Sequence, residues 1–351
     1  MKEFDEVFVD KTKYGTKLKT SDYKECGKYP IIDQGQETIA GYTDAEDGVF
    51  KEVPVIIFGD HTRVIKYVDK PFFLGADGVK VLRSKYLDAN YRYLFYALLD
   101  LKIPNTGYNR HFKWLKEAKI QYPTLKQQEK VVGILDKIEK VIAARNKQLN
   151  ALDELIQARF VELFGDPTIN TKKYPLKLLP EIAEYWNGLT YKPDDVADKG
   201  TIVLRSSNIQ NMTLDFEDIV RVNCKIGEKK YVHENDILMC SRNGSARLVG
   251  KVALIKNIEE PMSFGAFMLI IRSAYYPYLM TYFQMPAFRA QIVTGATTTI
   301  NQITGRMLDN VKLPVPDMYV VNQFADFVNQ VNKSKLVIKN LLQIYKHRIQ
   351  M

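Results

Sequence analysis

Apolar residues recur every three or four positions along two long stretches of this chain, one covering residues 124–164 and the other beginning near residue 320. A spacing of about 3.5 residues is the heptad pattern of helices that pair as coiled coils. The repeating positions are Val131, Leu135, Ile138, Ile142, Leu149, Leu152, Ile156 and Leu163 in the first stretch, and Phe324, Val328, Val331, Ile338, Leu342, Tyr345 and Ile349 in the second. Both stretches are therefore predicted to be long helices.

Three basic residues interrupt this apolar pattern: Arg145 and Arg159 in the first stretch and Lys335 in the second. Thr124 is a suitable N-terminal cap for the first helix, and Gly165 shortly after it is a stop signal. Two arrangements are compatible with the pattern. The helices can pair with each other as an antiparallel coiled coil, or each can pack onto its own domain, and their long polar outer faces favour the pair.

Part of the sequence occurs twice. Residues 106–149 and 299–342 share one pattern without a gap at a spacing of 193 residues, so that Leu115 matches Leu308. Each copy predicts a polar turn, a short basic helix, an apolar strand that ends at a proline, and then the long helix. A repeat of this length indicates two similar domains, each followed by its own helix, and hence a pseudo-twofold internal repeat.

Short apolar runs separated by turn residues predict strands in both domains. In the first domain these runs are 53–59 and 72–82, and a helix is predicted at 91–101. In the second domain they are 201–204, 236–240, 251–255 and 267–271. The predicted fold class is α/β (mixed α+β), divided into a first domain at 1–122, a first long helix at 123–166, a second domain at 167–315 and a second long helix at 316–351.

The composition limits the class of protein further. With 46% hydrophobic residues the chain can build real cores, yet it contains no run of about 18 apolar residues that could span a membrane. The charged N-terminus lacks the apolar core of a signal peptide, and three cysteines without close pairing favour a reducing cytoplasm over a disulfide framework or a zinc site. A net charge of +9 is compatible with binding a polyanion, although by itself it is weak support.

Common catalytic sequence patterns are absent from the chain. It has no GxxxxGK[ST] phosphate loop, no HExxH zinc pattern, no GxGxxG cofactor loop and no Asn-Pro-Pro-aromatic sequence of adenine methyltransferases. Its four histidines lack metal-ligand spacing. Asp60 and His61 can be interpreted as a catalytic pair or as a polar turn, and the turn is favoured. A non-catalytic protein is therefore predicted.

The junctions between the domains and the long helices resemble a known family. The first junction reads Ile120-Gln-Tyr-Pro-Thr-Leu-Lys-Gln-Gln-Glu-Lys-Val-Val-Gly-Ile-Leu-Asp136, and the first helix closes with Glu162-Leu-Phe-Gly-Asp-Pro167. The second junction, Val311-Lys-Leu-Pro-Val-Pro316, fits more loosely. Phe73-Leu-Gly-Ala-Asp-Gly78 in the first domain is matched by Ser263-Phe-Gly-Ala-Phe267 in the second. This pattern is similar to the specificity subunit of type I restriction-modification systems.

The resemblance implies a cytoplasmic DNA-binding subunit without an active site. Two target recognition domains would each bind one half of a bipartite double-stranded DNA target, and the coiled coil would set the gap between the halves. Two methyltransferase (modification) subunits would dock on the chain, joined by restriction/translocase subunits. S-adenosylmethionine, ATP and Mg would be bound by those partners, so no cofactor is expected here. The alternative is a non-catalytic scaffold that binds only proteins.

Contacts to DNA need basic, amide or hydroxyl side chains on the loops of a rigid domain. Loops after matching predicted strands provide His61, Thr62 and Arg63 in the first domain and Arg242, Asn243, Ser245 and Arg247 in the second. The repeated polar turn adds Asn109, Arg110 and Lys113, with Thr298, Asn301 and Arg306 in its second copy, and a further loop adds Arg205 and Ser206. Gln34 and Gln36 form a weaker candidate loop. The alternative for each loop is a solvated turn, especially at Asn243-Gly244.

Overall fold

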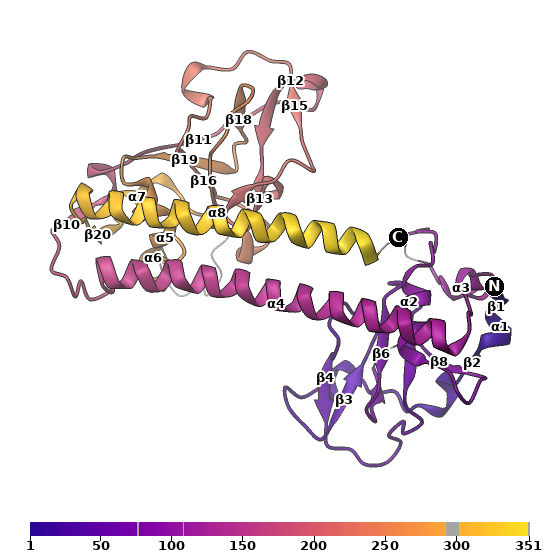
Figure 1. The fold of residues 1–351 in the computed structure, drawn as a ribbon. Helices are drawn as coiled ribbons and strands as arrows, with labels where there is room; N and C mark the ends of the chain where they lie inside the picture. Colours follow the sequence, from indigo (N-terminus) through magenta and orange to yellow (C-terminus); the bar gives the residue numbers. More distant parts are fainter. Residues whose placement is uncertain (76, 108, 293–301, 350–351) are drawn as a thin grey trace. The chain divides into compact units, whose positions relative to one another are not determined.

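The fold is described by a computed structural model that covers residues 1–75, 77–107, 109–292 and 302–349 (Figure 1). The chain divides into two compact units, one formed by residues 1–147 with 339–351 and the other by residues 148–338. Each unit contains one mixed domain and part of both long helices, α4 (Leu125–Phe164) and α8 (Met318–Ile349). In the described residues no helix is long and apolar enough to cross a membrane.

The first domain is built from three small sheets. A four-stranded antiparallel sheet has the order β2 (Phe8–Asp10), β8 (Val79–Ser84), β5 (Val55–Gly59), β6 (Ile65–Val68). A three-stranded sheet has the order β4 (Gly41–Thr43), β3 (Tyr29–Ile32), β7 (Phe73–Leu74), and β1 (Lys2–Glu3) pairs with β9 (Lys119–Ile120). The helices of this domain are α1 (Phe4–Val7), α2 (Tyr91–Leu99) and α3 (Phe112–Lys116).

The second domain repeats these sheets. Its four-stranded sheet has the order β11 (Glu184–Asn187), β19 (Met268–Arg272), β16 (Ile237–Cys240), β17 (Val252–Leu254). Its three-stranded sheet has the order β15 (Arg221–Val222), β12 (Val196–Leu204), β18 (Met262–Phe264), and β10 (Leu176–Leu178) pairs with β20 (Lys312–Pro314). The helices are α5 (Tyr276–Tyr282), α6 (Pro286–Ile292) and α7 (Gly305–Asp309), and a hairpin of β13 (Ile209–Gln210) and β14 (Thr213–Leu214) is added.

The internal repeat predicted from the sequence is confirmed strand by strand. In both domains the four-stranded sheet is antiparallel throughout, and the three-stranded sheet contains one parallel pair, β3 with β7 or β12 with β18. Helix α3 begins at Phe112 and α7 at Gly305, so the spacing of 193 residues persists through the short helix. Two domains of one architecture therefore carry different side chains.

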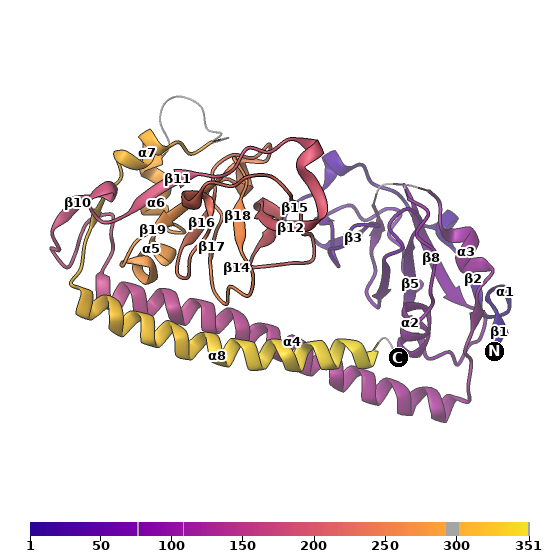
Figure 2. The same ribbon diagram turned by 90° about the horizontal axis from the view of Figure 1, so that it is seen from above.

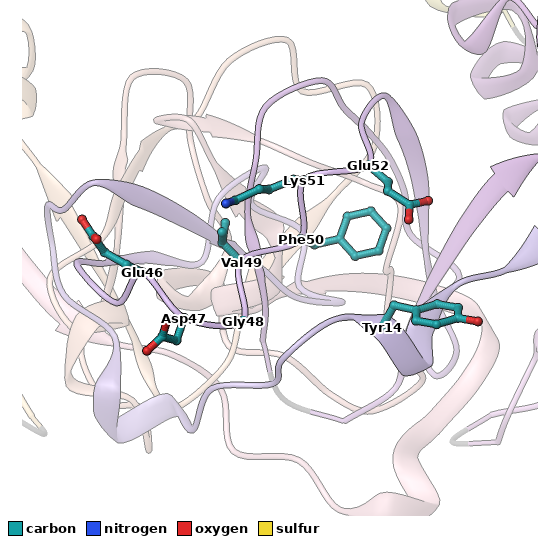
Figure 3. A pocket seen from close by; sticks show the side chains of 8 residues that line it. All are labelled: Tyr14, Glu46, Asp47, Gly48, Val49, Phe50, Lys51 and Glu52. Carbon is teal, nitrogen blue, oxygen red and sulfur yellow. The ribbon is translucent and has the colours of Figure 1, made fainter.

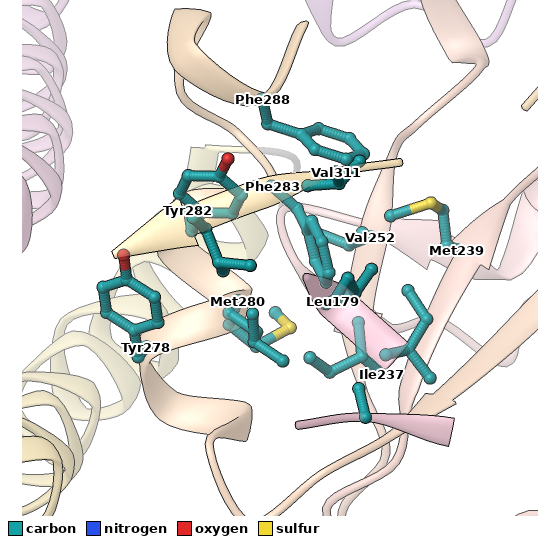
Figure 4. Close-up of a cluster of buried hydrophobic side chains, with 14 of the residues drawn as sticks. Leu179, Ile237, Met239, Val252, Tyr278, Met280, Tyr282, Phe283, Phe288 and Val311 are labelled. Carbon is teal, nitrogen blue, oxygen red and sulfur yellow. The ribbon is translucent and has the colours of Figure 1, made fainter. Parts of the chain in front are cut away.

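One inner strand of each four-stranded sheet, β5 in the first domain and β16 in the second, is buried on both faces. In β5, Ile56 and Phe58 belong to one apolar cluster whereas Val55 and Ile57 belong to another. The second domain does the same with Ile237 and Met239 on one face of β16 and Leu238 and Cys240 on the other, and Figure 4 shows the first of these faces packed against α5. Because successive side chains point to opposite faces, a strand covered on both sides must be apolar without interruption.

One predicted strand is wrong. Residues 72–82 form two strands, β7 and β8, which lie in different sheets of the first domain. The chain turns between them at Gly78, whose φ of +89° lies in the left-handed region that favours glycine. The predicted strands near 53–59, 201–204, 236–240, 251–255 and 267–271 and the helix near 91–101 are present, with ends that differ by a few residues.

The two long helices pair in antiparallel fashion, as predicted. Within the second unit, the Phe324 ring of α8 lies 5.7 Å from the Phe160 ring of α4. Three residues further along α8, the Phe327 ring lies 5.7 Å from the guanidinium of Arg159, which precedes Phe160 on α4. Lys335 then forms an ion pair with Asp153. Residue numbers rise along one helix as they fall along the other, and Figures 1 and 2 show α4 and α8 side by side. Lys335 can lie on the apolar seam because Asp153 neutralises it.

The end of α4 also packs onto the second domain, although α4 follows the first domain in the sequence. Phe160 and Phe164 are fully buried, although neither lies on the predicted seam. Their rings lie 5.2 Å and 4.9 Å from the ring of Tyr278, which belongs to α5. A helix that packs against a partner helix and a domain at once needs a wider apolar stripe than the two positions per heptad of a simple pair.

The first domain holds α4 by polar contacts in addition to the packing of Val132 against its core. The Arg92 guanidinium on α2 donates hydrogen bonds of 2.7 Å to both Asp136 and Glu139 on α4. The Tyr96 hydroxyl donates a further bond of 2.7 Å to Asp136, and the Arg92 guanidinium stacks on Tyr67. Although partial burial works against it, hydrogen bonding from Arg92 and Tyr96 lowers the pKa of the Asp136 carboxyl.

Replacing Phe160 by alanine should destabilise the second unit strongly. A fully buried aromatic side chain contributes about 3–5 kcal/mol against such truncation, because its loss leaves a cavity. Urea unfolding should therefore show a markedly lower midpoint for Phe160→Ala. The neighbouring exposed Val161 is the matched control, and Val161→Ala should stay within about 0.5 kcal/mol of the wild type. Equal effects of the two variants would contradict the packing described here.

Replacing Asp136 by asparagine should give a defect that depends on pH. The folded-state pKa of Asp136 is lowered, so its stabilising contribution is complete above the unfolded value of about 3.9 and is lost as pH falls through the folded value. Asp136→Asn should therefore unfold more easily than the wild type at pH 7. Thermal unfolding followed from pH 7 to pH 3 should show this difference shrinking below about pH 4. A difference that stayed constant over this range would rule out the Arg92 interaction as its cause.

Candidate nucleic-acid interface

Three loops meet at one edge of the first domain. They follow β3, β5 and β7 and comprise residues 33–37, 60–63 and 77–78, which we call the first loop edge. The Gln34 side chain joins them, because its Oε1 accepts a hydrogen bond of 3.1 Å from the His61 main-chain N–H and its Nε2 donates one of 2.9 Å to the carbonyl of Asp77. The hydroxyl of Thr62 donates to the Gln34 carbonyl at 2.7 Å. The predicted loop of His61 and Thr62 and the weaker Gln34 candidate thus form one site.

The Gln34 side chain can connect the loops because it lies close to the main chain at Gly78. A Cβ at that position would lie 2.6 Å and 2.7 Å from the amide nitrogen and oxygen of Gln34. A side chain there would displace Gln34 from the main-chain groups that it binds, and the positive φ of Gly78 would add strain. Glycine at the turn between β7 and β8 is therefore required for the contact between the loops.

The repeated polar turn is tied to the same edge through Asp60. The Asp60 carboxylate accepts a hydrogen bond of 2.8 Å from the N–H of Phe112, and its carbonyl accepts one of 2.7 Å from the N–H of His111. Asp60 and His111 are both buried. Asp60 therefore anchors the start of α3, as expected of a polar turn, and places the exposed residues Asn109, Arg110 and Lys113 beside the first loop edge.

Charged residues at the first loop edge are partly engaged with one another. The Lys17 ammonium lies 2.7 Å from the Asp77 carboxylate. This hydrogen bond, with a smaller effect of the Arg110 charge, lowers the pKa of Asp77. The Lys113 ammonium lies 4.7 Å from the centre of the Trp114 ring. The predicted reader Arg63 is half-buried, and its Nη1 donates to the carbonyl of Ile103 at 3.3 Å.

The corresponding loops of the second domain surround an open cleft of about 890 Å³. It brings together four of the predicted residues, Arg205, Ser206, Arg242 and Asn243. The remaining lining residues are Leu189, Thr190, Tyr191, Ser207, Asp218, Gly244, Gly265, Ala266, Phe267 and Met268. We call this surface the second loop edge, because its loops follow β12, β16 and β18, the equivalents of β3, β5 and β7.

Side chains at the second loop edge are held in place by mutual contacts. The Arg242 guanidinium stacks on the exposed Phe267 ring at 5.4 Å, and its main-chain N–H donates to the Phe267 carbonyl at 3.1 Å. The Asn243 amide donates to the Ser206 hydroxyl at 3.2 Å, which links two of the loops. Arg205 forms an ion pair of 2.7 Å with Asp218 that neutralises part of its charge.

The other predicted residues lie outside this cleft. Ser245 and Arg247 belong to the same loop as Asn243 and are exposed, and Arg306 is exposed on α7. Thr298 and Asn301 fall outside the described residues. The sequence did not single out Phe267 or Asp218, because only the fold brings them to Arg242 and Arg205. Gln34, the weaker candidate of the sequence, follows the end of β3 as Ser206 follows the end of β12.

A second hollow in the first domain is unsuited to DNA. It has a volume of about 380 Å³ and is lined by Tyr14, Glu46, Asp47, Gly48, Val49, Phe50, Lys51 and Glu52 (Figure 3). Three carboxylates against one lysine would repel phosphate groups. Among the described residues, no group of histidine, cysteine, aspartate and glutamate could hold a metal ion.

Comparisons with known proteins agree with this architecture. Residues 1–154 match the family described as type I restriction modification DNA specificity domain. The chain is 25% identical to the type I restriction enzyme EcoR124I/EcoR124II specificity subunit of Escherichia coli, over 91% of this chain and 82% of that protein. The crystal structure of the type I restriction-modification S subunit from M. genitalium matches in fold, with a TM-score of 0.55, 15% identity and coverage of 99% and 94% of the two chains.

A solved structure that concerns complex assembly and conformational transition of the type I R-M system also has the same fold. Its TM-score is 0.56 at 16% identity, and the match covers 99% of this chain and 93% of the other. Together with the sequence matches, this confirms the resemblance found in the sequence. The chain is therefore similar to the specificity subunits of type I restriction-modification systems, and its residues 1–154 match the DNA specificity domain of those systems.

Replacing Asp60 by alanine should detach α3 from the first loop edge. The variant leaves the partly buried N–H of Phe112 without its acceptor, a loss of about 1 kcal/mol or more. Hydrogen exchange of the amides at the start of α3 should become faster in Asp60→Ala. Asp69→Ala, which removes an exposed carboxylate after β6, should leave this exchange unchanged. Unchanged exchange in both variants would show that Asp60 does not anchor the turn.

Proposed function

We propose that the two loop edges each read one half of a bipartite double-stranded DNA target. The observation that carries this proposal is the equivalence of the two edges in position but not in side chains. Each is formed by loops after the same three strands of one architecture, yet one presents Gln34, His61 and Thr62 and the other presents Arg242 and Asn243. Two domains that recognise different half-sites need the same scaffold but different polar side chains on their loops.

The second loop edge has the chemistry for direct readout in the major groove. The Arg242 guanidinium can donate two hydrogen bonds to the O6 and N7 of guanine, and an asparagine amide can do the same with adenine. Stacking on Phe267 restricts the Arg242 side chain, so less conformational freedom is lost when it binds. The exposed Phe267 ring is itself suited to contact with the methyl group of thymine.

The first loop edge is suited to a different set of bases. The side chains of Gln34, His61 and Thr62 carry both donors and acceptors. Arg110 and Lys113 on the adjoining turn are exposed cations that can contact phosphates. In the second domain, Arg306 is the counterpart of Lys113, and Arg247 on the loop after β16 is a further exposed cation.

The long helices are proposed to set the distance between the half-sites and to dock two methyltransferase subunits, which restriction/translocase subunits join. Several apolar side chains remain exposed on them: Val131, Ile134, Val141 and Leu155 on α4, and Leu336, Val337 and Ile344 on α8. Such side chains are available to partner proteins. S-adenosylmethionine, ATP and Mg would be bound by those partners in the cytoplasm. A scaffold that binds only proteins would use the same helices but would show no DNA sequence preference.

Replacing Arg242 or Asn243 by alanine should relax recognition of one half-site only. Loss of a bidentate base contact reduces discrimination by about 1–3 kcal/mol, which is roughly 5- to 150-fold. Binding of the complex with its methyltransferase partner to a library randomised in each half-site measures this directly. Lys130→Ala, which removes an exposed charge from α4, should leave both preferences intact. Variants that keep the full preference at both half-sites would contradict the assignment of these residues.

A further inference from the structure

The hairpins that form the two loop edges close at equivalent residues, Arg63 and Gly250. In the first domain the N–H of Gly59 donates to Val64 and the N–H of Arg63 donates back to Gly59, at 2.8 Å and 2.7 Å. In the second, the N–H of Cys240 donates to Lys251 and that of Gly250 donates to Cys240, at 2.9 Å and 2.8 Å. Both closing residues have positive φ, 62° for Arg63 and 79° for Gly250.

In the first domain the closing residue Arg63 carries a guanidinium itself. In the second domain the closing residue is Gly250, and the guanidinium beside it comes from Arg289 on α6. Arg289 on α6 places its Nη1 2.9 Å, and its Cζ 3.0 Å, from where a Cβ of residue 250 would be. The guanidinium therefore fills the space that the beginning of a side chain at Gly250 would take. The position of the Arg289 guanidinium therefore depends on glycine at residue 250, since a larger residue there would displace it.

In the first domain, too, an arginine connects the hairpin to the segment after the helix, but here the arginine belongs to the hairpin. The Arg63 side chain leaves the hairpin and donates to the carbonyl of Ile103, four residues after the end of α2. Helix α6 follows α5, which is the counterpart of α2, at the corresponding place in the second domain. In each domain a guanidinium thus lies between the reading hairpin and the segment after the helix.

Both guanidinium groups lack a neutralising carboxylate among the residues that the structure describes. Within the described parts of the chain, no carboxylate forms an ion pair with Arg63 or Arg289, whereas Arg205 is paired with Asp218. The undescribed residues 293–301, which follow α6, contain neither aspartate nor glutamate. Burial lowers the pKa of the Arg289 guanidinium, as expected of a half-buried charge without a counter-charge. Such a cation is stabilised when an anion approaches it.

We propose that Arg63 and Arg289 are equivalent phosphate-binding residues, one for each half-site, and that neither reads a base. This proposal rests on the DNA-binding function proposed above. The anion that reaches a hairpin beside base-reading loops is the phosphate of the adjoining backbone. A planar guanidinium with several donors matches two phosphate oxygens. Arg63 would thus bind the backbone, whereas its neighbours His61 and Thr62 would contact the bases.

The salt dependence of binding tests this assignment. The complex with its methyltransferase partner is titrated with target DNA at several salt concentrations, and the sequence preference is measured on the half-site libraries. Loss of one phosphate contact should reduce the slope of log K against log salt by about 0.9 without changing the preferred bases. Arg63→Ala and Arg289→Ala should each show this. Arg83→Ala and Arg221→Ala remove arginines paired with Glu52 and Glu260 and should leave the slope unchanged.

A transplanted arginine distinguishes a lost phosphate contact from a damaged fold. Gly250→Arg alone should weaken binding, because its side chain collides with Arg289. In the double variant Arg289→Ala with Gly250→Arg, the hairpin supplies the guanidinium as Arg63 does in the first domain. The salt slope should then return toward the wild-type value. Arg63 itself shows that arginine can occupy this left-handed position.

Four outcomes would decide against parts of this account. Wild-type binding with unchanged slopes in both alanine variants would overturn the phosphate role and leave the proposed function intact. A relaxed preference at one base position with an unchanged slope would make the residue a base reader and would also overturn the proposal. No sequence preference in the wild-type complex would overturn the proposed function, and the phosphate assignment with it. Failure of the double variant to recover, although it unfolds like the wild type, would contradict the equivalence of the two positions.

Discussion

Burial of one central strand on both faces is the constraint on which each domain depends. Strand β5 or β16 divides its domain into two apolar clusters, so neither face of the strand can carry a polar side chain. Function is therefore confined to the loops at the strand ends. The hairpin after the central strand meets the loops from the parallel pair of the smaller sheet, and the rigid double-sided core holds them at fixed positions.

The two domains make equivalent contacts with different side chains. The first holds its long helix through Arg92 and two carboxylates, whereas aromatic side chains from α5, α4 and α8 pack together in the second. The first supplies its hairpin guanidinium from the hairpin itself, and the second from α6. Architecture has been kept while the side chains have changed, which is what independent recognition of two half-sites requires.

Much of this fold could be predicted from the sequence, because its strongest signals are periodic. The heptad pattern and the repeat at 193 residues identified both long helices and the two similar domains. Local patterns could not show that Phe160 and Phe164 are buried, since this depends on a domain that packs beside the helix. Nor could they show that Gly78 divides a run of apolar residues between two sheets. The loops of the candidate site were predictable as segments, but Phe267, Asp218 and Arg289 reach it only through tertiary contacts.

Mapping of DNA methylation in cells most directly tests the central claim that two domains read two half-sites. The genome is sequenced from cells that carry this chain with its methyltransferase partner, and from cells in which the chain carries alanine at Arg242 and Asn243. A bipartite methylated motif should appear with the wild-type chain, and the variant should lose definition in one half while it keeps the other. An uninterrupted motif, or methylation that does not change when the chain is deleted, would contradict the account.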